Sequence, residues 1–122
     1  MKALHTMILA IAMVAATLAS PFASAHAKLT SSNPEAGATL AAAPKEIALT
    51  FNEKIEAAFS SITLADAEGK AVAPGKAKVD AANPAILRLE VPALSAGAYT
   101  VSWVAVGHDG HRRTGDFKFT VK

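Results

Sequence analysis

Apolar residues recur at every second position in several short runs of this chain, and this alternation constrains its fold more than any other feature. The alternating runs cover residues 47–51, 62–64, 87–91, 99–103 and 117–121. A period of two places successive side chains on opposite faces of a strand, whereas an amphipathic helix repeats its apolar positions about every 3.6 residues. Turn-forming pairs such as Asn33-Pro34, Pro74-Gly75 and Asn83-Pro84 separate the runs. About six or seven short strands are predicted, which favours an all-β fold, either a β-sandwich or a Greek-key barrel.

The N-terminal segment has the three parts of a secretory signal peptide. Lys2 gives it a positive start, residues 7–16 are apolar, and Ala23-Ser24-Ala25 matches a small-x-small cleavage site. The apolar stretch is shorter than the roughly 20 residues that a helix needs to cross a bilayer. We therefore predict a cleaved signal peptide at 1–25 and one mature domain at 26–122. The alternative is an uncleaved membrane anchor.

The charge balance and the absence of sulfur narrow the function of the mature chain. The whole sequence has 12 Lys and Arg, 10 Asp and Glu, and no Cys. No basic stripe indicates nucleic acid binding, and a disulfide scaffold, a cysteine nucleophile and a thiolate zinc site are excluded. Met1, Met7 and Met13 would all leave with the signal peptide. Any metal on the mature domain must then be bound through nitrogen and oxygen.

Two aromatic residues, Tyr99 and Trp103, lie in the predicted strand 99–103. Tyr99 follows Gly97 at the start of that strand, where sandwiches often keep a tyrosine whose hydroxyl bonds back to the preceding corner. We expect both side chains in the core, the alternative being stacking against a ligand.

Cleavage after Ala25 would make His26 the first residue of the mature protein. Its free α-amine and its imidazole Nδ1 can then bind one metal ion together, whereas in the precursor the same nitrogen is an amide. An N-terminal histidine is also a possible accident of cleavage, so this feature carries little weight alone.

A polar, glycine-containing loop at residues 106–115 holds the other mature histidines, His108 and His111. Asp109 and His111 are two positions apart, so in an extended segment their side chains would share one face and could reach one ion. Together with His26 they would supply three nitrogens and one oxygen, a set that suits Cu(II). The alternative is a hairpin turn at Asp109-Gly110 with solvated histidines.

At these residues the chain resembles the CopC family of periplasmic copper-binding proteins, including its YobA-type members. The similarity covers essentially the whole mature chain, and Asp109-Gly110-His111 is its most diagnostic part. Other matching segments are residues 26–29, 32–34, 47–53, 97–103 and 117–121. The resemblance implies a seven-stranded Greek-key sandwich, immunoglobulin-like or cupredoxin-like, that binds Cu(II) through His26, Asp109 and His111.

The resemblance also implies roles for residues around the ligands. Glu53 stands where the family has an acidic residue near the site, and we expect it to accept a hydrogen bond from the N-terminal amine or to orient a ligand; a solvated carboxylate is the alternative. His108 replaces a small polar residue of the family, and we expect its side chain to point away from the metal. The methionine-rich segment that gives some members a Cu(I) site has no counterpart between Glu68 and Val79.

The function that the resemblance implies is a periplasmic Cu(II) carrier in copper homeostasis and resistance, which is not an enzyme. Its partner in the family is often a CopD-type inner-membrane copper transport protein, and a monomer is the simplest expectation. The main alternative is an oxidative enzyme with a histidine brace, like the polysaccharide monooxygenases. A carboxylate at Asp109 would fill the position that oxygen activation needs open, and no aromatic surface for a glycan is evident. A metal-free exported adhesion domain is the third possibility. Copper binding should weaken as pH falls below the histidine range.

Overall fold

The computed structural model describes residues 27–122, so the expected signal peptide (1–25) and His26 lie outside the described residues. The described chain forms eight strands and one short 3-10 helix. These elements are β1 (Leu29–Asn33), β2 (Thr39–Leu40), β3 (Glu46–Phe51), η1 (Ala57–Phe59), β4 (Ser61–Ala65), β5 (Lys78–Val79), β6 (Ile86–Glu90), β7 (Gly97–Val106) and β8 (Arg112–Val121). None of the helical structure within residues 27–122 is long and apolar enough to cross a membrane.

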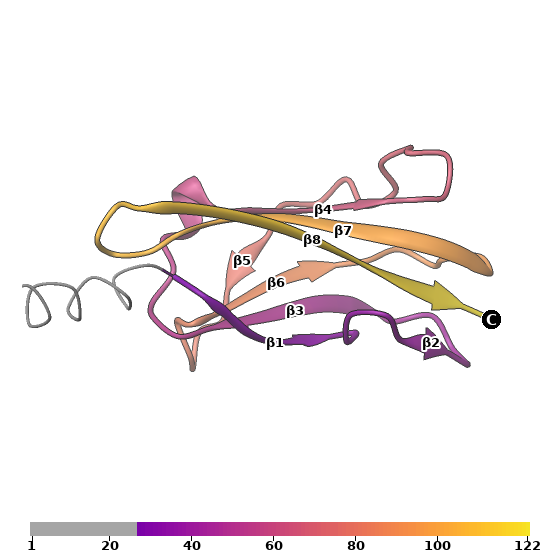
Figure 1. Cartoon of the computed structure of the whole chain (residues 1–122), viewed down its shortest axis with the longest axis horizontal. Coiled ribbons are helices and arrows are strands. Elements are labelled where there is room, and N and C mark those ends of the chain that lie inside the picture. The colour runs from indigo at the N-terminus through magenta and orange to yellow at the C-terminus, as the bar shows by residue number, and fades with distance from the viewer. Residues whose placement is uncertain (1–26) are drawn as a thin grey trace, which may run out of the picture.

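The strands form two four-stranded sheets, in the orders β1-β3-β6-β5 and β2-β8-β7-β4. Figure 1 shows them as two layers, with β7 and β8 in one and β1 and β3 in the other. Neighbouring strands are antiparallel except β2 and β8, which run parallel. The predicted all-β sandwich is confirmed. The structure has eight strands where the sequence analysis expects seven, because β2 and β5 span two residues each and are too short to show an alternation.

The core lies between the sheets and contains the apolar residues of the alternating runs. Ile47, Leu49 and Phe51 of β3 are buried, whereas Ala48 and Thr50 between them are partly exposed. The same alternation holds in β7, where Tyr99, Val101 and Trp103 face inward. Each buried Leu, Ile or Phe contributes about 1.5–3 kcal/mol relative to an exposed one.

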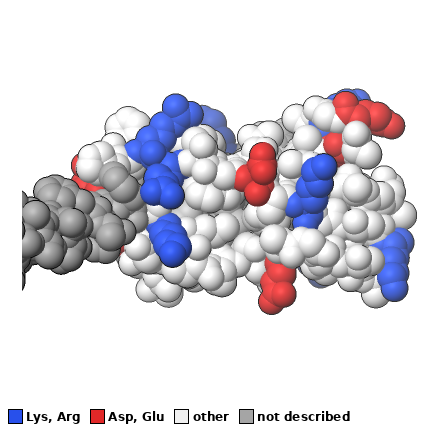
Figure 2. Space-filling model, viewed as in Figure 1, with Lys and Arg blue, Asp and Glu red and all other residues white. Residues whose placement is uncertain are grey.

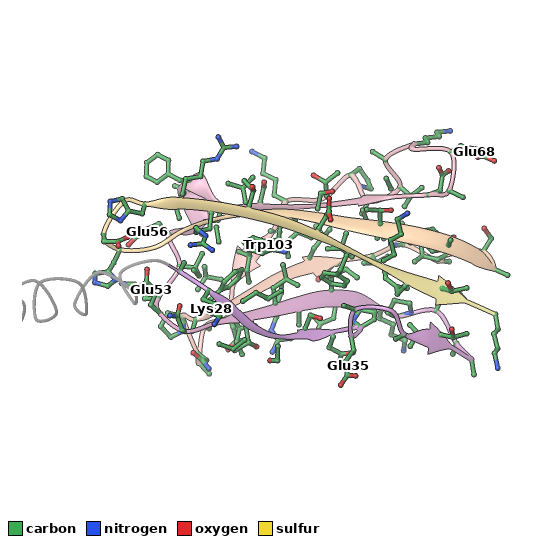
Figure 3. The ribbon with its side chains drawn as sticks, viewed as in Figure 1. Lys28, Glu35, Glu53, Glu56, Glu68 and Trp103 are labelled. Carbon is green, nitrogen blue, oxygen red and sulfur yellow. The ribbon has the colours of Figure 1, made fainter. Side chains whose placement is uncertain are left out.

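Both aromatic residues of β7 are core residues, as predicted. The Tyr99 hydroxyl donates a hydrogen bond to the Ser95 carbonyl oxygen (2.6 Å), and the Tyr99 ring stacks on Phe119 at a centroid distance of 5.6 Å. Trp103 lies between the layers in Figure 3 and meets Phe51 edge to face at 5.2 Å. Only 5% of Tyr99 and 9% of Trp103 are exposed, which favours the core role over stacking against a ligand.

Candidate metal centre

Three chain segments meet at the end of the sandwich where the described chain begins. Lys28 N–H donates to Asn52 Oδ1 (2.7 Å), and Asn52 N–H donates to the Lys28 carbonyl (3.0 Å). Beyond Asn52 the chain pairs with the base of the β7–β8 loop through a bridge between Ile55 and Gly107. In Figure 1 this loop lies at the same end as the start of β1, far from the C-terminus. The segment that follows β3 therefore connects the N-terminal segment to the loop that holds Asp109 and His111.

The loop between β7 and β8 is a tight turn, which corrects the extended conformation assumed from the spacing of Asp109 and His111. Gly110 N–H donates to the Gly107 carbonyl (3.0 Å), and Gly110 has a φ of 82°, which favours glycine. Asp109 Oδ1 accepts the backbone N–H of His111 (3.1 Å), a pattern typical of Asp in turns. The side chains converge because the turn and this hydrogen bond hold them together. The hairpin turn at Asp109-Gly110, which the sequence analysis gives as the alternative, is thus present.

Asp109 and His111 place two atoms that can bind a metal ion, a carboxylate oxygen and an imidazole nitrogen, next to each other. Asp109 Oδ2 and His111 Nδ1 lie 3.1 Å apart, with 28% of the Asp109 side chain and 57% of the His111 side chain exposed. The His111 backbone N–H is the main cause that lowers the pKa of the Asp109 carboxyl; desolvation opposes it, and the imidazoles of His111 and His108 lower it further. Asp109 is therefore ionised at neutral pH, the form in which a carboxylate binds a metal.

Glu53 brings a second carboxylate to the same loop. It lies just beyond β3 at this end of the sandwich in Figure 3. Its Oε1 is buried and has no hydrogen-bond partner among residues 27–122. The carboxylate occupies the place where a Cβ on Gly107 would stand, and Asp109 Oδ1 lies 3.2 Å from that place. A buried oxygen without a donor is costly, so this atom needs a donor or a cation from elsewhere.

The described residues hold only part of the predicted ligand set. The structure brings Asp109 and His111 together and places Glu53 beside the loop, while His108 is exposed next to them. Within residues 27–122 no group of three or more His, Asp or Glu side chains is arranged to hold a metal ion. Since His26 lies outside the described residues, its part in the site stays a prediction.

Two residues at this end were not singled out from the sequence. Asn52 anchors the N-terminal segment through its side chain and its backbone, and Gly107 leaves room for the Glu53 carboxylate. Each had a weak signal, because Asn52 directly follows a strand and Gly107 punctuates the histidine loop. Neither signal names the partner, since the contacts join segments far apart in the sequence.

Charges of both signs are present on one face of the fold (Figure 2). In Figure 2, Lys and Arg side chains are interspersed with Asp and Glu side chains along the face shown. On the outer face of β6, Arg88 bridges Glu46 (2.6 Å) and Asp80 (2.9 Å). These pairs stabilise the fold away from the loop end.

Residues 29–122 match the family described as the CopC domain. The chain is 37% identical to protein YobA of Escherichia coli K12 over 115 residues, which cover 93% of this chain and 92% of YobA. Its fold is similar to the crystal structure of CopC from Methylosinus trichosporium OB3b, with a TM-score of 0.76, 38% identity, and coverage of 80% of this chain and 94% of that one. It is also similar to PcoC, described as a methionine-rich copper resistance protein from Escherichia coli, with a TM-score of 0.69, 37% identity, and coverage of 80% and 100%.

Proposed function

Since the chain belongs to the CopC family, we propose that it is a periplasmic Cu(II) carrier in copper homeostasis and resistance. The proposed mature protein starts at His26 after removal of residues 1–25. It binds one Cu(II) through the His26 amine and imidazole together with Asp109 and His111. It carries the ion as cargo and is not an enzyme.

The observation that carries this proposal is the Asp109–His111 pair at the end where the described chain begins. The pair presents an ionised oxygen donor and an imidazole nitrogen 3.1 Å apart. Ala27, which follows His26 in the sequence, is fully buried, and Lys28 is tied to Asn52 by two hydrogen bonds. These contacts fix the backbone directly after His26, which favours a metal site of defined geometry.

The environment of Glu53 supports a hydrogen-bond donor from the N-terminal segment at this end of the sandwich. Its buried Oε1 lacks a partner among residues 27–122, and the α-amine of His26 is a chemically suitable donor. The role proposed for Glu53 is to accept this hydrogen bond and so to hold the amine in position for the metal. A hydrogen bond to a charged group of this kind contributes about 1.5–3 kcal/mol.

The oxidation state follows from the donor types. Nitrogen and oxygen donors suit Cu(II), whereas Cu(I) prefers thiolate and thioether sulfur. Residues 27–122 contain no Met and no Cys, in contrast with the relative described as methionine-rich. A second site for Cu(I) is therefore not part of this proposal. A CopD-type inner-membrane protein remains the proposed partner, with the carrier as a monomer.

The deciding experiment is a Cu(II) titration with EPR on two proteins, one starting at His26 and one with a single extra residue before it. The proposal expects tighter binding and a distinct spectrum for the first form, because only that form has a free amine on His26. Identical affinities and spectra would refute the N-terminal site. His111→Ala should weaken binding, whereas the neighbouring His108→Ala serves as the matched control and should have little effect.

A further inference from the structure

Gly107 and Glu53 fit together in a way that the ligand set does not explain. Gly107 is buried at the base of the β7–β8 loop. The Glu53 carboxylate fills the volume that a side chain on Gly107 would need, since Oε1 overlaps the Cβ position and Cδ lies 2.9 Å from it. We infer that Gly107 is a positioning residue of the metal centre, because the space left by its missing side chain holds the Glu53 carboxylate beside Asp109. We call this space the seat of Glu53. This inference rests on the proposed Cu(II) site.

The backbone at Gly107 is compatible with alanine. Its φ does not belong to the positive values found at Gly37, Gly69, Gly97 and Gly110, so a Cβ brings no backbone strain. The effect of Gly107→Ala therefore comes from the contact alone. The overlapping atoms belong to the far end of a flexible side chain, so the cheapest response is that the Glu53 carboxylate swings out of its seat while the strands stay in place.

Loss of the seat has a consequence for the metal. Asp109 Oδ1 is 3.2 Å from the same Cβ position, so Glu53 and Asp109 flank a single α-carbon. Once displaced from this place, the Glu53 carboxylate can no longer accept the hydrogen bond proposed from the α-amine of His26. Substitution of groups that orient metal ligands typically weakens metal binding by about 10- to 100-fold. Gly107→Ala should therefore weaken Cu(II) binding about tenfold or more, although neither glycine nor alanine has a side-chain atom that binds a metal.

A double-mutant cycle tests this inference in the mature protein that starts at His26. Cu(II) affinity is measured by chelator competition for the wild type, Gly107→Ala, Glu53→Ala and the double variant. Gly107→Ala should weaken binding about tenfold or more in the wild-type background and less than about twofold in the Glu53→Ala background, where the overlapping Glu53 carboxylate is absent and only the 3.2 Å approach to Asp109 Oδ1 remains. Gly75→Ala is the matched control, because Gly75 also lacks a positive φ and a Cβ there meets nothing within 4 Å.

Two further measurements separate the possible failures. A crystal structure of metal-free Gly107→Ala should show the Glu53 carboxylate displaced and the strands unchanged, and urea denaturation should confirm that the variant is folded. Wild-type affinity in Gly107→Ala, or the same loss in both backgrounds, would overturn the inference while leaving the proposed function standing. Failure of the wild type itself to bind Cu(II) would instead overturn the proposed function and this inference with it.

Discussion

Asp109 has two roles in the loop, one in the turn and one as a proposed ligand, and two substitutions separate them. In the wild type, Asp109 Oδ1 accepts a hydrogen bond from the His111 backbone N–H at 3.1 Å. Asp109→Asn retains an oxygen that can accept this hydrogen bond but removes the negative charge. Asp109→Ala removes both. An intramolecular hydrogen bond of this kind contributes about 0.5–1.5 kcal/mol, so the Ala variant should lose up to this amount of folding stability and the Asn variant very little.

Copper affinity should respond differently from stability. Asp109 is the only charged donor in the proposed set, and its lowered pKa keeps it ionised. Both variants should therefore bind Cu(II) at least about tenfold more weakly, which corresponds to about 1.4 kcal/mol of binding free energy. The two variants should thus be similar in affinity and distinct in stability.

Trp103 gives a convenient assay, because it is the single tryptophan of the chain. Trp103 lies on β7, where it pairs with Gly115. It is four positions before Gly107, which directly follows β7, so the two residues are roughly 13 Å apart at about 3.3 Å per residue. Quenching of its fluorescence by Cu(II) reports binding, and urea denaturation of the metal-free proteins reports stability. Wild-type affinity in a folded Asp109→Asn protein would refute Asp109 as a ligand.

Two further predictions concern the fold. Tyr99→Phe removes the 2.6 Å hydrogen bond to the Ser95 carbonyl and should lower the free energy of unfolding by about 1 kcal/mol, measured by urea denaturation; an unchanged midpoint would contradict the role of this corner. The hydrogen bond from Arg88 is the main cause that lowers the pKa of the Asp80 carboxyl in the folded protein. The pair therefore stabilises the fold at pH values above the unfolded pKa of Asp, about 3.9. This stabilisation is lost as the pH falls through the lower pKa of the folded state. Asp80→Asn should accordingly flatten the acid limb of the stability curve, and an identical curve for both proteins would contradict the argument.

Much of the sandwich was predictable because burial against a second layer imposes a period of two. Ile47, Leu49 and Phe51 follow this rule, and β3 appears where the sequence predicts it. β7 and β8 extend further toward the loop than predicted, since Ala105 and Arg113 pair in the ladder although they add no alternation of large apolar residues. Backbone pairing continued the strands where the side-chain pattern had ended.

The proximity of Asp109 and His111 was predictable for a local reason, whereas the fit of Gly107 against Glu53 was not. Asp109 and His111 are close in the chain, so almost any turn brings them together, although the responsible geometry is a hydrogen-bonded turn and not an extended strand. The seat formed by Gly107 and Glu53 depends on how the end of β3 packs against the β7–β8 loop. No pattern in either segment specifies that contact.

The sequence alone therefore determined the all-β fold and the positions of the strands with alternating apolar residues, and its lack of Cys, with Met only at positions 1, 7 and 13, leads to the prediction of nitrogen and oxygen donors. Periodicity and composition can be derived from the sequence because they do not depend on how the strands are arranged in space. Only the tertiary structure decided which segments meet at the loop end, that Asn52 anchors the chain at Lys28, and that Glu53 keeps a buried oxygen without a partner within residues 27–122. These features depend on close packing between distant segments, because burial and the filling of a few cubic ångströms are set only when both partners are in place.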